Sequence, residues 1–178
     1  MNSKIFNIYL NSNDKLTGST NNNANFNIDF NTLLPKDNNP YYKVSFSFQC
    51  NSGYFKDTIS GTQNLTYSNY TKLYNNIKIL TNFQCGNVSY DSTTKSQSLI
   101  LGYANRDIQN ASGYSTGNSY NCWFDYNAPK IIMKPTTNIL NVQLINSFDN
   151  SFLTDTNSTG VAFSDTTPWT MILMFEQI

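Results

Sequence analysis

The feature of this sequence that most constrains its fold is a strict alternation of apolar and polar side chains. Five apolar residues alternate with four polar ones in a single run: Tyr42, Val44, Phe46, Phe48 and Cys50 with Lys43, Ser45, Ser47 and Gln49. Successive side chains of a β-strand point to opposite faces of its sheet, so the run predicts a strand with one buried face. We expect the polar side chains to face solvent or another subunit.

Shorter alternations and apolar runs recur along the chain. They predict further strands over residues 5–10, 26–30, 77–79, 99–103, 120–126, 131–133, 140–144 and 169–175. Turn signals separate many of them, notably over 11–25, 35–40, 112–119 and 146–168. The last stretch also holds Phe148, Phe152, Leu153 and Phe163, which suggest a folded-back loop or a docking surface. The run 169–175 is apolar on both faces except at Thr170, so it should be buried on both sides or covered by a partner.

Composition supports this all-β interpretation. The chain holds 12 Tyr and 12 Phe, few Ala and one Glu, Glu176, whereas a helical protein uses Ala, Glu, Leu and Lys heavily. A chain of 178 residues fits one domain with its own core. The sequence therefore predicts an all-β fold, a single jelly-roll β-sandwich of about eight antiparallel strands, in one domain spanning residues 1–178.

The charge pattern argues against two classes of partner. Eleven basic and eleven acidic residues give a net charge of zero, and Arg106 is the sole Arg. A protein that neutralises many phosphates needs a basic patch, so we expect no direct nucleic-acid binding. No apolar run approaches the roughly 20 residues of a membrane span. The start, Met1 to Lys4, lacks a signal-peptide core, so the chain is expected to fold in the cytosol.

The cysteines and the glycosylation sequons add little. Cys50, Cys85 and Cys122 are odd in number and widely spaced, which predicts buried free thiols rather than a disulfide framework. Asn-x-Ser/Thr sequons occur at Asn64, Asn69, Asn87, Asn110 and Asn157. An Asn-rich chain with this much Ser and Thr produces about that many by chance, so we attach no function to them.

The residues that carry most enzyme chemistry are missing from the sequence. There is no His, no glycine-rich phosphate loop and no singled-out pair of carboxylates. Residues Asp155 to Gly160 resemble the opening of a calcium loop, but position twelve is Thr166 where Glu is required, so a polar turn is expected. The sequence predicts no enzyme, with no catalytic residues, no cofactor and no metal site.

Tyrosines in polar surroundings leave two binding functions open. They are Tyr54, Tyr67, Tyr70, Tyr74, Tyr114 and Tyr120. A Tyr side chain offers a flat apolar face and a polar tip, which suits both sugars and protein interfaces. We favour protein interfaces because charged residues are also depleted there. A carbohydrate-binding or receptor-binding β-sandwich module remains the alternative.

Two stretches carry a resemblance to a known family. The first is Ile5 to Ser12, then Ala24 to Phe30 with Leu33 to Pro35, then Tyr42 to Phe46. The second is Ile139 to Leu144 followed by Pro168 to Glu176. Together they resemble the first and last strands of the single jelly-roll minor capsid and penton proteins of virophages, polinton-like viruses and nucleocytoplasmic large DNA viruses.

The resemblance implies a structural role in an icosahedral shell. Proteins of this family form pentamers at vertices or smaller minor proteins between major capsomers. This chain would then assemble with itself, as a pentamer or trimer, and with a major capsid protein. It would be made in the host cytoplasm and end in the virion. The family usually packages its genome apart from these small proteins, which agrees with the absence of a basic arm.

Overall fold

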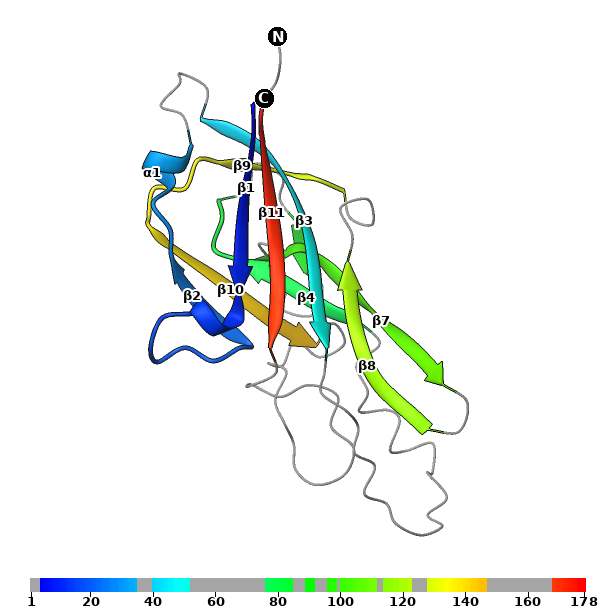
Figure 1. Cartoon of the computed structure of the whole chain (residues 1–178). Coiled ribbons are helices and arrows are strands. Elements are labelled where there is room, and N and C mark those ends of the chain that lie inside the picture. The colour runs from blue at the N-terminus through cyan, green and yellow to red at the C-terminus, as the bar shows by residue number, and fades with distance from the viewer. Residues whose placement is uncertain are drawn as a thin grey trace.

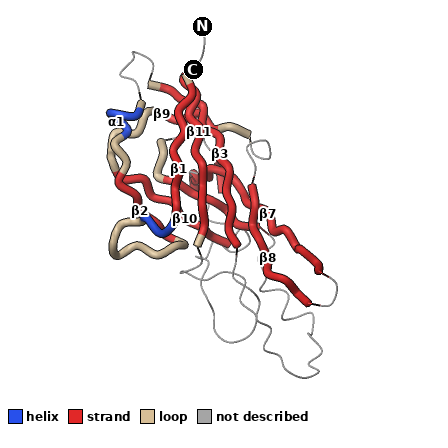
Figure 2. The backbone as a smooth tube through the Cα atoms, in the orientation of Figure 1, coloured by secondary structure: helices blue, strands red, loops and turns tan. Residues whose placement is uncertain are grey.

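The computed structural model describes residues 4–34, 40–51, 76–84, 89–91, 96–98, 100–111, 114–122, 128–146 and 168–178. These residues are mostly strand, which confirms the predicted all-β fold (Figure 2). The elements are β1 (Ile5–Asn11), η1 (Ser12–Asp14), β2 (Asn23–Asn27), α1 (Phe30–Leu33), β3 (Tyr41–Asn51), β4 (Asn76–Thr81), β5 (Ser89–Asp91), β6 (Ser96–Ser98), β7 (Ile100–Ala111), β8 (Tyr114–Cys122), β9 (Lys130–Met133), β10 (Ile139–Asn146) and β11 (Trp169–Gln177).

Two antiparallel sheets of four strands form the layers of a β-sandwich (Figure 1). The first sheet has the order β1-β11-β3-β9, and the second has the order β2-β10-β4-β7. Strands β5 and β6 pair with each other outside both sheets. The first and last strands are neighbours, with Ile5 facing Glu176 and Asn11 facing Thr170.

Strand β8 connects the two layers along one side. Strand β3 is long enough to pair with β9 through Tyr41–Val44 and with β8 through Phe48–Asn51. The opposite edge of β8 pairs with β7 of the second sheet. Hydrogen bonding therefore runs without interruption from β1 to β2, and these two strands are the free ends of the series.

The core lies between the sheets and follows the alternation of the sequence. The five apolar residues of β3 are all buried, as are Trp169, Met171, Leu173 and Phe175 of β11. At one end, Phe175 makes edge-to-face contacts with Phe30, Tyr42 and Phe83. At the other end, Trp169 packs against Phe26 and Phe48, with ring centroids 5.8 Å apart in both cases. Each such side chain contributes roughly 1.5–3 kcal/mol on burial.

The chain between β1 and β2 covers the end of the core where Trp169 lies. Its turn requires a glycine, because Gly18 has a φ of +88° and the Ser19 N–H donates to the Leu16 carbonyl at 3.1 Å. This is the geometry of a turn whose third residue has positive φ. The Leu16 N–H then donates to the Asn25 carbonyl at 2.7 Å, which holds the loop against β2.

Several predicted boundaries are wrong. The expected strand over 26–30 is replaced by β2, which starts inside the expected loop 11–25, and by the short helix α1. The helix forms because the Asp29 carboxylate accepts the backbone N–H groups of Asn31 and Thr32 and so caps its first turn. Phe26, Ile28 and Phe30 nevertheless all point into the core, as their alternation predicted.

The expected turn at 112–119 is also wrong. Strand β8 begins at Tyr114 and includes Gly117, because cross-strand pairing with β7 continues almost to the hairpin tip. Strand β7 is correspondingly much longer than the predicted 99–103. The ladder accommodates this length with an irregularity between Ile108 and Asn110. The predicted strand 120–126 is described only as far as Cys122, and residues 147–167 of the expected long connection lie outside the described residues.

Candidate interaction surface

The described residues contain no cluster of His, Cys, Asp or Glu that could hold a metal ion. Cys50 is buried, and desolvation raises the pKa of its thiol far above the ordinary value, so the reactive thiolate is disfavoured. This agrees with the prediction of a buried structural thiol at Cys50. Cys122 ends β8, and Cys85 lies outside the described residues.

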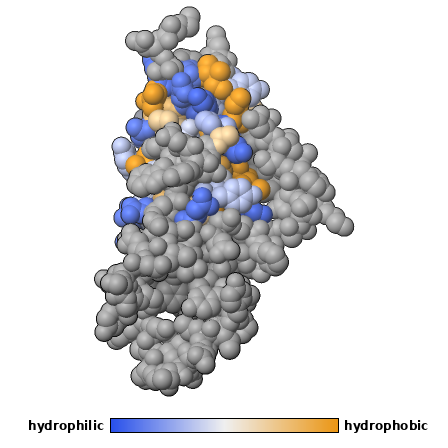
Figure 3. All heavy atoms as spheres, turned by 90° about the vertical axis from the view of Figure 1, so that its right-hand side faces the viewer, coloured by the Kyte–Doolittle hydropathy of each residue, from blue (hydrophilic) through white to orange (hydrophobic). Residues whose placement is uncertain are grey.

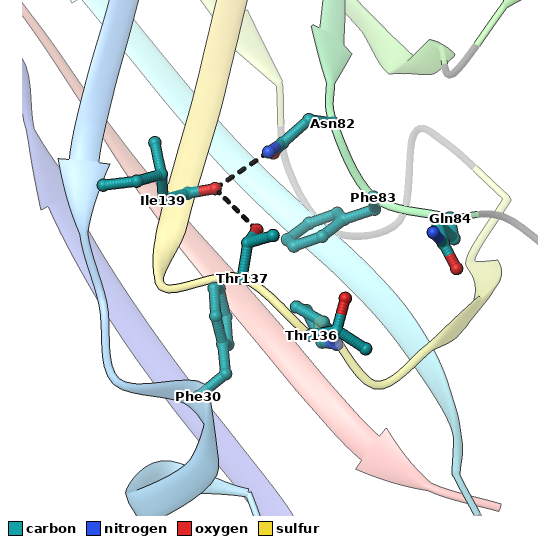
Figure 4. A pocket seen from close by; sticks show the side chains of 8 residues that line it. Phe30, Asn82, Phe83, Gln84, Thr136, Thr137 and Ile139 are labelled. Carbon is teal, nitrogen blue, oxygen red and sulfur yellow. Dashed lines mark hydrogen bonds between the residues drawn. The ribbon is translucent and has the colours of Figure 1, made fainter.

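A small hollow opens where α1, the end of β4 and the β9–β10 connection meet (Figure 4). Its volume is about 110 Å³, and its lining includes Phe30, Asn82, Phe83 and Thr137. Pockets for small molecules usually measure roughly 300–1,000 Å³. The hollow is therefore too small for a typical cofactor or substrate.

Two polar side chains that line this hollow, those of Asn82 and Thr137, already bond to β10. The Asn82 amide donates to the Ile139 carbonyl at 2.8 Å and accepts the Asn141 N–H at 3.0 Å. The Thr137 hydroxyl donates to the same Ile139 carbonyl at 3.3 Å (Figure 4). The ring of Phe83 points toward the β9–β10 connection. These contacts hold the start of β10.

The outer face of the first sheet is the more informative surface. We use this term for the side chains that point away from the core on β1, β11, β3 and β9. Its exposed apolar members are Ile5, Tyr9, Tyr41, Ile131 and Met133, and its half-buried apolar members are Ile172 and Met174. Strand register places Tyr41 beside Met133, and Tyr9 beside Ile172. An apolar set spread over four adjacent strands is typical of a surface that another protein covers.

Charge on this outer face is low and balanced. Among its described residues the charged ones are Lys43 and Glu176, which face each other across β3 and β11. Their Nζ and Oε2 atoms lie 3.3 Å apart. Tyr and Met are enriched in protein interfaces and charged residues are depleted, and the outer face follows that composition. Figure 3 shows one flank of the molecule, where hydrophobic residues (orange) reach the surface among hydrophilic ones (blue).

The polar partners in the alternation of β3 divide into two groups. Lys43 and Gln49 are exposed, as expected of side chains that face solvent or another subunit. Ser45 is buried and Ser47 half-buried, and they lie opposite Met174 and Ile172 of β11. On the second sheet, the outward-facing Lys78 of β4 is buried as well, although alternation alone suggested exposure.

Most residues singled out for binding fall outside the described part of the chain. Tyr54, Tyr67, Tyr70 and Tyr74 lie there, as does the calcium-like segment Asp155 to Gly160 with Thr166. Tyr114 and Tyr120 belong to β8, where the structure describes the backbone alone. Carbohydrate binding, and the absence of a metal or cofactor, therefore stay predictions.

Sequence reasoning missed most members of the outer face. The order of the strands in the sheet decides which side chains of β1 and β9 stay exposed. Those side chains are Ile5 and Tyr9 on β1, and Ile131 and Met133 on β9. The signal that did exist was the apolar character of residues 169–175 on both faces, which predicted burial on both sides or cover by a partner. Ile172 and Met174 are the residues of that strand that lie on the outer face.

Comparison of the chain with known proteins found no match: no family model, no curated protein and no solved structure matches it. Within the described residues, no helix has the length and apolar character needed to cross a membrane.

Proposed function

We propose that this protein is a structural capsid protein of a eukaryotic double-stranded DNA virus, a minor capsid or penton protein built on a single jelly roll. In this proposal it assembles with itself, as a pentamer or trimer, and with a major capsid protein in an icosahedral shell. It is made in the host cytoplasm, becomes part of the virion and has no catalytic role.

The observation that carries the proposal is the nested pairing of the strands. Strand β1 pairs with β11, β2 with β10, β3 with β9, and β4 with β7. Pairing of first with last, second with second-to-last and so on is what results when one long antiparallel ribbon of eight strands is wrapped into two sheets. That wrapping is the jelly roll, an architecture that recurs in viral capsid proteins. In this scheme β5, β6 and β8 are additions to the eight paired strands.

The outer face supports self-assembly. A shell subunit spends its functional life in contact with neighbours, so apolar and aromatic side chains on its surface are covered in the particle. Tyr9 is 73% exposed and Ile5 is 55% exposed in the single chain. The net charge of zero means that copies approach one another without long-range repulsion.

Light scattering on the purified full-length chain tests the self-assembly. We expect a discrete species whose mass is a whole multiple of the 20.2 kDa subunit. A chain that stays monomeric at every concentration, and that also fails to bind a shell of major capsid protein, contradicts the proposal.

A further inference from the structure

The free edge of β1 carries backbone groups with no hydrogen-bond partner among the described residues. The Gln177 N–H donates to the Lys4 carbonyl at 3.2 Å, so these two residues form a hydrogen-bonded pair of the β1–β11 ladder. Such pairs alternate with non-bonded pairs in antiparallel strands. Phe6, Ile8 and Leu10 therefore bond to β11.

The N–H and C=O groups of Ile5, Asn7 and Tyr9 consequently point away from β11, toward the outside of the sheet. The other side of β11 obeys the same alternation, because the Ile178 N–H donates to the Tyr41 carbonyl at 3.5 Å. Both observations give β1 one bonded edge and one open edge.

This open edge lacks the features that usually block strand addition. Natural edge strands are protected by charged residues, proline, bulges or short length. Strand β1 has seven residues, no charge and no proline, and its register with β11 is unbroken from Ile5 to Asn11. It is therefore a ready template for one more strand.

We propose that the open edge of β1 pairs with the β1 edge of a second copy of this chain, antiparallel, about a two-fold axis at Asn7. In that register Asn7 faces Asn7 of the second copy, and Ile5 faces Tyr9 twice by symmetry. Each facing pair exchanges two backbone hydrogen bonds, so every open N–H and C=O of Ile5, Asn7 and Tyr9 is satisfied.

The side chains favour a second copy as the occupant. A two-fold contact requires a self-complementary strand. Here an aliphatic side chain meets an aromatic one at both ends, a favourable cross-strand pair, and an amide meets an amide in the centre. On the core side of the strand, half-buried Phe6 faces Ile8 of the second copy. No two charges of like sign meet in this register.

The inference rests on the self-assembly proposed above and names its contact. A two-fold contact joins subunits in pairs, so it can link neighbouring pentamers or trimers, which meet across two-fold axes in an icosahedral shell. A closed oligomer carries one such edge on every subunit, so several oligomers can join. The wild-type mass in solution should then be at least twice that of the closed oligomer, or twice that of the monomer where no closed oligomer forms.

The test is the substitution Asn7→Lys in the full-length chain, measured by light scattering and sedimentation. Two lysines at the axis repel each other, and we expect pairing to weaken by roughly tenfold or more, so that the mass falls to that of the closed oligomer or, where none forms, of the monomer. Mixing N7K with N7D in equal amounts places Lys against Asp and should restore the wild-type mass. Asn27→Lys adds the same charge at an exposed position of β2, on the second sheet and away from the outer face, and should leave the mass unchanged.

Hydrogen exchange resolved to single residues gives a second readout. The amides of Ile5, Asn7 and Tyr9 should exchange more slowly in wild type than in N7K. An N7K variant with the wild-type mass and exchange overturns the edge contact while leaving self-assembly intact. The same holds if N7K keeps its mass and loses binding to another shell protein instead. A wild type that is monomeric at every concentration overturns the edge contact, and it contradicts the proposed function as well only if the chain also fails to bind a shell of major capsid protein.

Discussion

The indole of Trp169 ties together three segments that are distant in sequence. Strand β1 ends at Asn11. Just beyond that end, the backbone N–H of Trp169 donates to the Ser12 hydroxyl at 2.9 Å. The indole Nε1–H donates to the Asn21 carbonyl at 2.6 Å, and the ring packs between Phe26 and Phe48. One residue of β11 thus fixes the loop between β1 and β2 against the core.

We predict that Trp169→Phe lowers the free energy of unfolding by about 1–3 kcal/mol, since the buried Asn21 carbonyl loses its donor while an aromatic ring is kept. Trp169→Ala should cost about 3–5 kcal/mol, because it also leaves a cavity. Urea unfolding followed by far-ultraviolet circular dichroism measures both. The matched control is Thr170→Val on the exposed face of β11, expected within about 0.5 kcal/mol of wild type. Equal stability of W169F and T170V would count against the role of the indole.

Asp29 illustrates a pH-dependent contact at the start of α1. The Thr32 hydroxyl, together with the Thr32 and Asn31 N–H groups, donates to its carboxylate and lowers the pKa of Asp29 below the ordinary 3.8. Because the folded-state pKa is depressed, this contact stabilises the fold above pH 3.8, and its contribution is lost as the pH falls through the folded pKa. An NMR titration should show the low value. Thr32→Val should raise it, and an unchanged pKa in that variant contradicts the assignment.

At the level of elements, side chains extend the β-ladders beyond the ends of strands. The Asn82 amide follows β4 and reproduces a strand's pair of hydrogen bonds with Ile139 and Asn141 of β10. On the other edge of β10, the side-chain amide of Asn141 donates to the side-chain oxygens of Asn23 and Asn25 on β2. The abundance of Asn in this chain therefore has a structural use at strand ends and edges.

Asn82→Ala should lower stability by about 1 kcal/mol through loss of these two bonds. The backbone N–H of Asn141 should then exchange its hydrogen faster, because the Asn82 side-chain oxygen that accepts it is gone. Asn27→Ala on the exposed side of β2 serves as the control. If the Asn141 amide exchanged at the same rate in N82A and wild type, the ladder extension would be wrong.

The Lys43–Glu176 pair lies between β3 and β11 with its two side chains 48% and 33% exposed. Solvent screening limits exposed pairs to about 0–1 kcal/mol. A double-mutant cycle with Lys43→Ala and Glu176→Ala should therefore return a coupling energy in that range. A coupling energy above about 2 kcal/mol would show that the pair is a major determinant of sheet stability.

Strands with one buried face could be predicted from the sequence. The extent of strands held mainly by cross-strand hydrogen bonds could not. Burial of alternate side chains produces the pattern in β3 and β10, so their positions follow from it, and β11 was found as a continuous apolar run. The distal part of the β7–β8 hairpin is polar and glycine-containing, and it extends through cross-strand hydrogen bonds that leave no hydrophobic period. The helix α1 was missed because capping by Asp29, rather than periodicity, stops the strand.

For the whole molecule, the sequence predicted an all-β sandwich, while the order of its strands required the structure. Which strand becomes an edge depends on pairing between the two ends of the chain, and no local pattern contains that information. The open edge at Ile5, Asn7 and Tyr9 was therefore beyond sequence reasoning. The apolar character of residues 169–175 on both faces nonetheless predicted that this strand is buried on both sides or covered by a partner.

The proposal that this sandwich is a building block of a viral shell is tested most directly by locating the chain in a reconstruction of intact particles. We predict that purified particles contain the chain, and that the two sheets, with β1 beside β11, fit density at fixed symmetry positions of an icosahedral shell. Particles that lack the chain, or that carry it at no ordered position, would contradict it.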